Sequence, residues 1–460
     1  MIDLEAKSLR VLKRLWHEGH PTDPPMEYEN ISEDKENNLV ISVYVSAFDH
    51  YRASIPYRNF GGHGGSVKIF WPKNGLEVKY LPDSKFFVLS KIIHHELFDI
   101  LRNYAKEAGA YLVYDLDDNM HEVEPSNCAF DFYNHLSDTG SKNISSFEYI
   151  VSNCDHVIYS TRELQAYYET LNPNSSVFPN FLDIDERYRD IKPVNWREIA
   201  LEQEVTFNDE SILVGFFGSD SHIDDLDILQ ESITKILNEN KNVIFAILTG
   251  QDLISSVLIK KWALPHKRFL YYSYQNINEY LKYVASFDIG LAPLKINYFN
   301  MAKSNLKLLE YGALGIPYVA SKIANLQRFH IESNKIGGFT CTTDDEWYER
   351  INYLVNNPDI RKQMGSAVKD YVYKQYDVKK SLTLMSNIFR TIHDNHNKYR
   401  KKPTMYELAD SYDNIPKAKV LYLEDDICPC GSGEKYINCK NNCYPAWGEI
   451  TKEDQCQSNN

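Results

Sequence analysis

The chain has 460 residues, of which 43% are hydrophobic and 25% are charged. This is the composition of an ordinary folded protein, and it excludes wholly disordered, collagen-like and coiled-coil chains. The formal net charge of −14 disfavours a protein that holds nucleic acid or an anionic membrane by bulk charge, so no nucleic-acid partner is expected. No apolar run of about 18 residues occurs, and the first residues lack the apolar core of a signal peptide. The sequence therefore predicts a cytoplasmic protein.

Residues 1–37 are predicted to form a helical extension. Leu9, Leu12 and Leu15 lie near helical spacing, with Lys13 and Arg14 between them. Packing of this helix on its own domain is the expected arrangement. A basic amphipathic helix also suits a membrane surface, so a peripheral position at the inner face of the membrane stays open as an alternative.

Short β-branched runs alternate with helical stretches over residues 38–183, and again over residues 184–396. Such alternation predicts a parallel sheet with helices on both faces. A charged stretch with a proline, residues 184–210, separates the two regions, which predicts two doubly wound Rossmann-like domains. Strands are expected at residues 39–48, 67–71, 77–81, 110–116, 149–161, 175–180, 212–219, 242–250, 288–294 and 316–321. Helices are expected at residues 90–109, 224–240, 277–287 and 304–315.

A small turn follows the first strand of the second region and contains Gly218, Ser219 and His222. In open parallel sheets, ligands bind beyond the carboxyl ends of strands, where loops and helix N-termini meet. Gly218 there allows a ligand to approach backbone N–H groups closely. The alternative is an ordinary tight turn with no ligand.

The segment that begins at Lys303 carries a second candidate group. Ser304 is predicted to cap a helix, and Lys303, Lys307 and Glu310 then fall at i, i+4 and i+7 on one helix face. Lysines near a helix N-terminus can neutralise a diphosphate, and a carboxylate further along can accept hydrogen bonds from ribose hydroxyls. The alternative is a solvated face in which Lys307 and Glu310 form an ordinary helix pair.

These residues resemble the donor-nucleotide region of the GT-B glycosyltransferases, in particular the large retaining type called glycosyl transferases group 1. The resemblance covers roughly residues 40–396 and is most specific in the second region. It rests on Val177-Phe178-Pro179-Asn180, Gly218-Ser219, Ser221-His222, Asp225-Leu226, Asp288, Pro293-Leu294, Lys303-Ser304, Lys307, Glu310-Tyr311, Ala313, Gly315, Pro317 and Ala320-Ser321.

The resemblance implies an α/β fold of GT-B architecture, with two Rossmann-like domains facing a cleft. It also implies a nucleotide-sugar-dependent transferase of the hexosyltransferase type that retains anomeric configuration, acts in surface polysaccharide or glycoconjugate synthesis and needs no cofactor for transfer. The donor would be bound by Gly218, Ser219, His222, Lys303, Ser304, Lys307 and Glu310.

Two positions depart from the family pattern. Many members have an arginine and a lysine in the loop that here runs from Gly218 to Asp225, and this chain has neither. Ala302 stands where a paired glutamate would lie, eight residues before Glu310. The positive charge that neutralises the diphosphate would then come from Lys303 or Lys307.

The first region is expected to hold the acceptor, which is a saccharide, a lipid-linked sugar or a protein. Tyr51 and Arg52 resemble the family's acceptor-side signature. Asp117 and Asp118 follow the strand at residues 110–116, and these two acids with His121 are the candidate catalytic residues. An alternative is the metal-binding Asp-x-Asp motif of a GT-A enzyme. For His121, a purely structural role is a second alternative.

Five of the eight cysteines lie in the last 33 residues, after a predicted linker at residues 397–425. Cys428, Cys430 and Cys439 have the spacing of a zinc site. Residues 426–446 resemble the SEC-C motif, in which the fourth ligand directly follows the third cysteine. Lys440 occupies that place, so Cys443 is the expected fourth ligand of a structural Zn²⁺. The resemblance implies docking of a protein partner, and reduced cysteines without metal are the alternative.

Two other functions stay open at this point. One is a GT-B nucleotide-sugar epimerase, since the arginine–lysine pair is missing. The other is a non-catalytic GT-B-like binding protein that is recruited through its zinc tail. A measurement of nucleoside diphosphate released from a nucleotide sugar distinguishes a transferase from the epimerase and from the binding protein.

Overall fold

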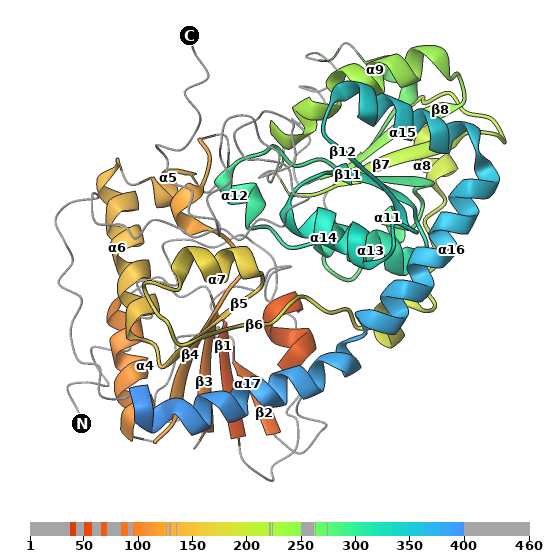
Figure 1. Ribbon diagram of the computed structural model, residues 1–460. Coiled ribbons are helices and arrows are strands. Elements are labelled where there is room, and N and C mark those ends of the chain that lie inside the picture. Colours follow the sequence, from red (N-terminus) through yellow and green to blue (C-terminus); the bar gives the residue numbers. More distant parts are fainter. Residues whose placement is uncertain are drawn as a thin grey trace. The chain divides into compact units, whose positions relative to one another are not determined.

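The computed structural model in Figure 1 describes the greater part of the chain. The described residues are 37–42, 50–57, 66–70, 84–90, 95–107, 109–125, 127, 130–134, 136–219, 222, 224–249, 262, 264–273 and 275–399. The predicted extension, the linker beyond residue 399 and the SEC-C segment with its four cysteines lie outside these residues.

The described residues form two compact units. The first unit takes its residues from 37–121, 132–181 and 378–399, and the second takes them from 122–131 and 182–377. The first boundary falls after Phe181, two residues from the expected one at residue 183. The second falls after Asp377, so the last helix belongs to the first unit.

The first unit is built on a six-stranded parallel sheet with the order β2-β1-β3-β4-β5-β6. Its strands are β1 (Asn37–Ser42), β2 (Ser66–Phe70), β3 (Ser84–Ser90), β4 (Tyr111–Leu116), β5 (His156–Tyr159) and β6 (Ser175–Val177). Its helical segments are η1 (His50–Ser54), α4 (His95–Glu107), α6 (Asp138–Asn153), α7 (Arg162–Tyr168) and α17 (Val378–Tyr399). Two short segments, η3 (Met120–Glu122) and α5 (Phe130–Tyr133), follow β4.

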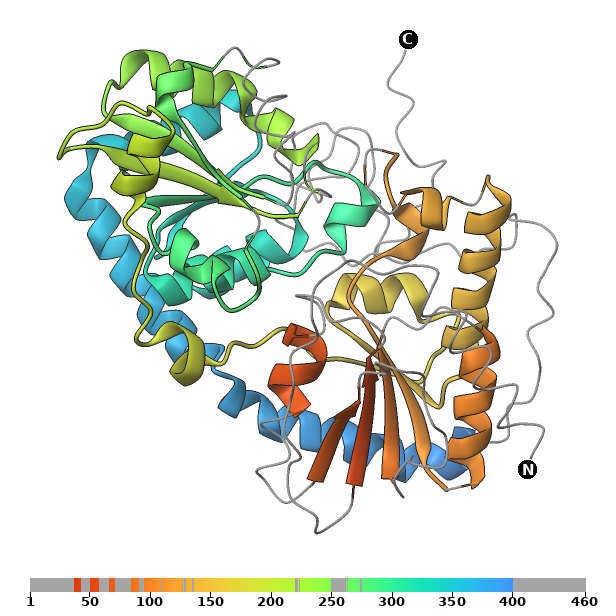
Figure 2. The same ribbon diagram turned by 180° about the vertical axis from the view of Figure 1, so that it is seen from behind.

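Helix α17 lies across one face of this sheet (Figures 1 and 2). Its apolar side chains, among them Met385 and Phe389, join Val88 and Val113 in one buried cluster. On the other face, Phe147 of α6 contacts the ring of Tyr114. Both faces of the central strands are therefore covered, which explains why all six residues of β4 are buried.

Strand β3 was not predicted from the sequence. Its apolar run continues into a helical pattern, and short apolar runs cannot be assigned to strand or helix by periodicity alone. The expected helix at residues 90–109 is α4, which begins only at His95. Its expected end is confirmed, because Gly109 has a φ of 66°, the left-handed conformation that glycine allows after a helix.

The second unit also contains a six-stranded parallel sheet, with the order β12-β11-β10-β7-β8-β9. Its strands are β7 (Ile212–Phe217), β8 (Val243–Leu248), β9 (Phe269–Tyr272), β10 (Ile289–Ala292), β11 (Tyr318–Ser321) and β12 (Gly338–Cys341). Its helical segments are η4 (Ile184–Tyr188), α8 (Trp196–Glu202), η6 (Asp224–Leu229), α9 (Gln230–Glu239), η7 (His266–Arg268), α11 (Tyr280–Val284), α12 (Tyr298–Met301), α13 (Leu306–Leu314), α14 (Ala324–Glu332), α15 (Asp344–Asn356) and α16 (Pro358–Gln375).

Helices α9 and α15 cover one face of this sheet, and α13 lies on the other (Figure 1). A close approach brings α13 onto the central strands. A Cβ atom at Gly290 of β10 would lie 2.6 Å from the ring of Tyr311, so only glycine leaves room for that ring. The Tyr311 hydroxyl donates to the Leu291 carbonyl oxygen at 2.9 Å. This contact sets the start of α13 beside the carboxyl end of β7.

The expected cap of α13 by Ser304 is wrong. The helix begins at Leu306, its N-cap residue is Asn305, and no side-chain cap hydrogen bond forms. The preceding short helix α12 causes this difference, because it ends at Ala302 and the chain turns before it becomes helical again. Lys303 therefore lies before α13, and the three residues Lys303, Lys307 and Glu310 do not share one continuous helix face.

None of the helices among the described residues combines the length and the apolar character that a membrane-spanning segment needs.

Candidate functional site

The carboxyl end of β7 carries the turn with Gly218, Ser219 and His222. All six residues of β7 are buried, and Gly218 N–H donates to the Leu248 carbonyl oxygen at 3.0 Å, which extends the pairing with β8. A Cβ atom at Gly218 would lie 2.9 Å from Phe216 Cζ and 3.2 Å from His222 Cδ2. Glycine at this position thus lets the His222 ring pack directly against the backbone.

The His222 ring is fixed by a buried carboxylate. His222 Nδ1 lies 2.9 Å from Asp225 Oδ2, and both side chains are buried. The other carboxylate oxygen, Asp225 Oδ1, accepts from the Lys295 backbone N–H and from Asn300 Nδ2, each at 2.8 Å. This group joins the turn after β7 to the loop after β10.

The charge of His222 follows from these surroundings. Burial and the positive charges of Lys307 and Lys303 lower its pKa to about 4, although the hydrogen bond to Asp225 acts in the opposite direction. At neutral pH the ring is therefore uncharged. A neutral imidazole donates through one nitrogen and accepts through the other.

Lys307 is the main positive charge of this strand end. It is the second residue of α13, and its Nζ lies 5.6 Å from the centroid of the Phe216 ring and 5.5 Å from that of Phe217. Burial and the neighbouring charge of Lys303 lower its pKa to about 8, and Glu310 and Asp225 partly offset this effect. Lys307 is half-buried, and an ammonium group whose charged form is disfavoured in this way is prepared to bind an anion.

Lys303 and Ser304 lie in the turn that precedes α13, and both are half-buried. Lys303 Nζ lies 4.4 Å from the centroid of the Phe299 ring. The carbonyl oxygen of Lys303 accepts from Asn325 Nδ2 at 3.0 Å, which holds the turn against α14. Lys303 and Lys307 are thus brought together around the same helix start, although by a turn and not by a shared helix face.

Glu310 is buried, with 1% of its surface exposed. Its Oε1 accepts from the hydroxyl of Tyr280 on α11. The rings of Tyr280 and Tyr311 both contact Phe217 at the end of β7. A carboxylate placed inside the unit in this way does not form the solvated helix pair that was the alternative prediction.

In the first unit, Arg52 is an internal residue. Its Nε and Nη2 donate to the two carboxylate oxygens of Asp115 at 2.8 and 2.9 Å, and Nη1 donates to the Phe178 carbonyl oxygen and to Asn180 Oδ1. Arg52, Asp115 and the predicted neighbour Tyr51 are all buried. The acceptor contact expected of Tyr51 and Arg52 stays a prediction. Asp115 thus faces Arg52 inside the unit.

His121 also has internal partners. Its Nδ1 lies 3.0 Å from the Tyr168 hydroxyl and its Nε2 lies 2.9 Å from Glu148 Oε1, while its side chain is 3% exposed. Both ring nitrogens are thus engaged within the unit, which agrees with the structural alternative. Asp117 and Asp118 are half-buried beyond the end of β4. Among the residues that the structure describes, no cluster of three or more His, Cys, Asp or Glu side chains has a metal-site arrangement.

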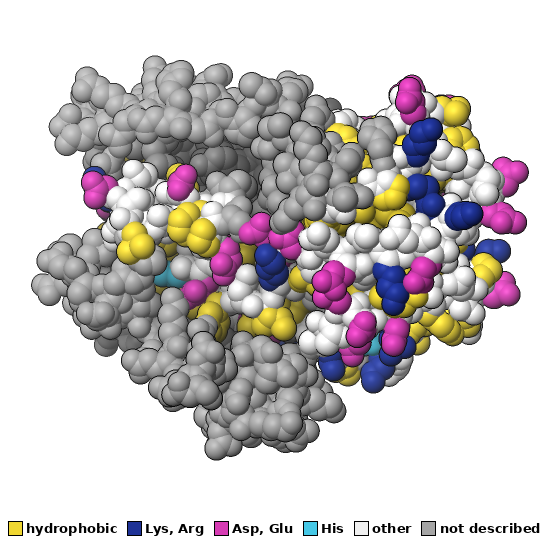
Figure 3. Space-filling view, turned by 90° about the horizontal axis from the view of Figure 1, so that it is seen from above, with side chains coloured by type: hydrophobic (Ala, Val, Ile, Leu, Met, Phe, Trp, Pro, Cys, Tyr) yellow, Lys and Arg dark blue, Asp and Glu magenta, His cyan; other side chains and the backbone are white. Residues whose placement is uncertain are grey.

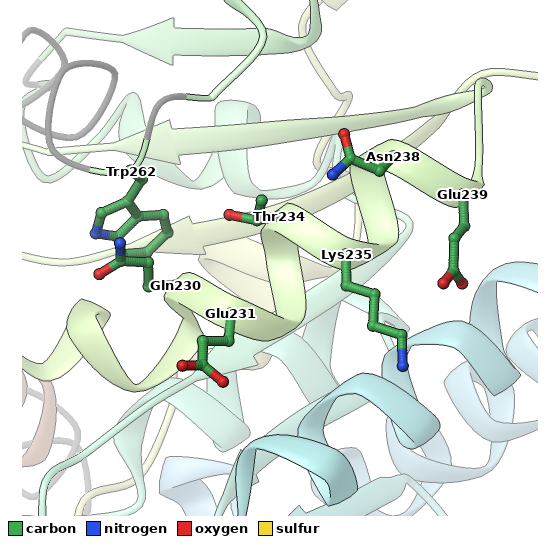
Figure 4. Close-up of a pocket in the computed structure, with 7 residues that line it drawn as sticks. All are labelled: Gln230, Glu231, Thr234, Lys235, Asn238, Glu239 and Trp262. Carbon is green, nitrogen blue, oxygen red and sulfur yellow. The ribbon is translucent and has the colours of Figure 1, made fainter.

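A pocket of 470 Å³ lies along α9 (Figure 4). Its lining shares no residue with the group at the end of β7. It is formed by Gln230, Glu231, Thr234, Lys235, Asn238, Glu239 and Trp262. On the side of the molecule seen in Figure 3, acidic and basic side chains are interspersed over the described surface of the second unit. Neither acidic nor basic side chains predominate on this surface.

The sequence interpretation assigned no role to Asp225, Asn300 or Tyr280, although Asp225 was part of the resemblance. Asn300 lies 75 residues from Asp225 in the chain, and Tyr280 lies 30 residues from Glu310. Spacing along one helix or strand cannot reveal such pairs. The order of strands β7 and β10 in the sheet was the missing information.

Comparison with known proteins gives a family match over part of the chain. Residues 249–386 match a family described as glycosyl transferase-like. A search of curated proteins gave no match. The family match confirms the expected enzyme class, a glycosyltransferase.

Solved structures share the fold. HepE of Anabaena in complex with UDP-glucose has a TM-score of 0.56 at 14% identity, with 78% of this chain and 100% of that chain covered. Sucrose-phosphate synthase from Thermosynechococcus elongatus has a TM-score of 0.54 at 11% identity, with 78% and 100% covered. WaaG, a glycosyltransferase of lipopolysaccharide biosynthesis, has a TM-score of 0.51 at 15% identity, with 76% and 98% covered. These likenesses confirm the expected α/β fold with two parallel sheets.

Proposed function

We propose that this glycosyltransferase takes its sugar from a nucleotide-sugar donor, of which UDP-glucose is the first candidate, and transfers it to a saccharide, lipid-linked or protein acceptor with retention of configuration. The single observation that carries the proposal is the half-buried ammonium group of Lys307, which lies beside Phe216 and Phe217 at the carboxyl end of β7. HepE, which shares the fold, binds UDP-glucose.

The chemistry of transfer explains why such a group is needed. The nucleoside diphosphate leaves as an anion while the anomeric carbon gains positive charge, and stabilisation of that leaving charge is the largest contribution a protein can make. Lys307 supplies the positive charge, with Lys303 beside it. Glu310 accepts hydrogen bonds from the ribose, and His222 with Gly218 borders the sugar and phosphate region.

The catalytic contribution of the first unit is assigned to Asp117 and Asp118, which follow β4. His121 is assigned to positioning, since both its ring nitrogens have partners within the unit. Tyr51 and Arg52 support the acceptor region from the interior. For the C-terminal segment, we propose a structural Zn²⁺ held by Cys428, Cys430, Cys439 and Cys443, on the spacing of these residues alone.

The proposal is tested by incubating the full chain with a panel of nucleotide sugars and measuring released nucleoside diphosphate. We expect release with at least one donor, increased by an acceptor, and product of retained configuration. A nucleotide-sugar epimerase would convert the sugar without adding it to an acceptor. A binding protein without turnover would bind the donor and release nothing, and either result contradicts transfer.

Glu310→Ala is expected to weaken binding of the nucleoside diphosphate by about 1 to 3 kcal/mol, the range for a lost hydrogen bond to a charged group. The binding constant is measured by calorimetry, and the melting temperature of the variant shows whether the buried site is still folded. Glu349→Ala is the matched control, because Glu349 is exposed on α15. Unchanged affinity in Glu310→Ala would remove this residue from the site.

A further inference from the structure

Asp225 is the residue on which the hydrogen bonds of this strand end converge. Its side chain is 4% exposed. Its Oδ1 accepts from the Lys295 backbone N–H and from Asn300 Nδ2, and its Oδ2 contacts His222 Nδ1. One donor is the Lys295 backbone N–H, which cannot reverse its role. A carboxylate held in this way serves as a fixed acceptor, so the proton in its contact with His222 belongs to the imidazole.

This arrangement selects one tautomer of His222. Nδ1 faces Asp225 Oδ2 at 2.9 Å, so Nδ1 carries the proton and Nε2 carries a lone pair. Within the described residues, no hydrogen-bond partner is assigned to Nε2. Because Nε2 is bonded to Cδ2, it lies at the edge of the ring that packs against Gly218.

A lone pair at this position distinguishes between ligand groups. It accepts a hydrogen bond from a hydroxyl, whereas it offers nothing to a phosphate oxygen, which is itself only an acceptor. The phosphate charges are left to Lys307 and Lys303, which lie near enough to lower the pKa of His222. The two kinds of group at this strand end therefore suit the two parts of a sugar diphosphate.

We propose that Asp225 is a positioning residue that keeps the proton of His222 on Nδ1, so that Nε2 accepts a hydrogen bond from a hydroxyl of the donor sugar. The sugar contact rests on the proposed function. The tautomer itself is a property of the unliganded protein and can be measured without any ligand.

The first test is the ¹⁵N spectrum of histidine-labelled full-length protein, with His222 assigned by its disappearance in His222→Gln. We expect a protonated Nδ1 and an unprotonated Nε2 at pH 7. In Asp225→Asn, the new amide nitrogen donates to Nδ1 while its oxygen still accepts from Lys295, so the proton should move to Nε2. A wild-type protein with the proton on Nε2 would overturn the proposal, whether or not the variant folds.

The second test compares the dissociation constants of UDP-glucose and UDP. Asp225→Asn is expected to weaken UDP-glucose binding about tenfold, equivalent to one hydrogen bond, with UDP binding changed less than about twofold. Asp227→Asn is the matched control, since it removes the same charge from the same helical segment and should leave both constants unchanged. With His222→Leu, the change at Asp225 should have no further effect on the ratio of the two constants.

The outcomes separate the two claims. Equal weakening of UDP and UDP-glucose in Asp225→Asn would show a merely structural role and overturn the role of Asp225. A wild-type protein that binds neither ligand would contradict the proposed donor. Binding of both ligands by the wild type, with an unchanged ratio in the variant, would contradict only the inference on Asp225 and His222.

Discussion

Replacing Lys307 with methionine is expected to weaken UDP binding by about 10- to 100-fold, which corresponds to a lost charged hydrogen bond of about 1.5 to 3 kcal/mol. Methionine retains the apolar contact with Phe216 and Phe217 and removes only the ammonium group. Because burial and the charge of Lys303 disfavour the charged form of Lys307 in the free protein, a bound diphosphate offsets both effects by its opposite charge. The dissociation constant by calorimetry gives the result.

The control for Lys307→Met is Lys362→Met, which removes one charge from an exposed position on α16. It should leave UDP affinity nearly unchanged, since exposed charges are screened by solvent and salt. If both variants weaken UDP binding equally, the effect is one of net charge, and Lys307 is not a ligand. Turnover with the active nucleotide sugar should fall in Lys307→Met and persist in Lys362→Met.

Arg52→Met is expected to destabilise the first unit by about 3 to 5 kcal/mol, because it leaves the buried Asp115 carboxylate without its partner. Burial already raises the pKa of Asp115, and Arg52 is the group that counteracts this effect. The same substitution breaks the hydrogen bonds that tie η1 to residues 178–180. Hydrogen exchange of the peptide that contains β4 measures the free energy of unfolding locally.

Arg189→Met provides the matched comparison. Arg189 also pairs with an aspartate, Asp185, but both side chains are largely exposed, so little change is expected. The double variant Arg52→Met with Asp115→Leu should recover a large part of the lost stability, since no buried charge is then left unpaired. An Arg52→Met variant as stable as Arg189→Met would show that the buried pair does not hold the first unit together.

Much of the fold was predictable from local pattern. The runs that became β7 and β8 are continuous apolar segments, the run of β4 is interrupted only by Asp115, and the glycine after α4 has the left-handed conformation expected of a helix end. Strand β3 was missed because its apolar run adjoins a helical pattern. The start of α13 was misplaced because Ser304 satisfies the local capping pattern, whereas the end of α12 decides where the chain turns.

The site was predictable only in part. Lys307 and Glu310 could be grouped from the sequence because their spacing along one helix is a local property. The partners of Arg52, and the Lys295 and Asn300 partners of Asp225, lie 63 to 128 residues away in the chain, so they depend on strand order and register, which no local pattern contains. For this reason the sequence placed Arg52 at an acceptor site, although its guanidinium group binds inside the unit.

The most direct test of the diphosphate site is proton uptake on UDP binding at pH 8.5. The pKa of free Lys307 is about 8, so most of this group is deprotonated at that pH, and a bound diphosphate raises its pKa again. Calorimetry in two buffers of different ionisation enthalpy should show uptake of about half a proton or more per UDP bound. In Lys307→Met the uptake should disappear. The same uptake in both proteins, or none in the wild type, would contradict binding of the diphosphate by Lys307.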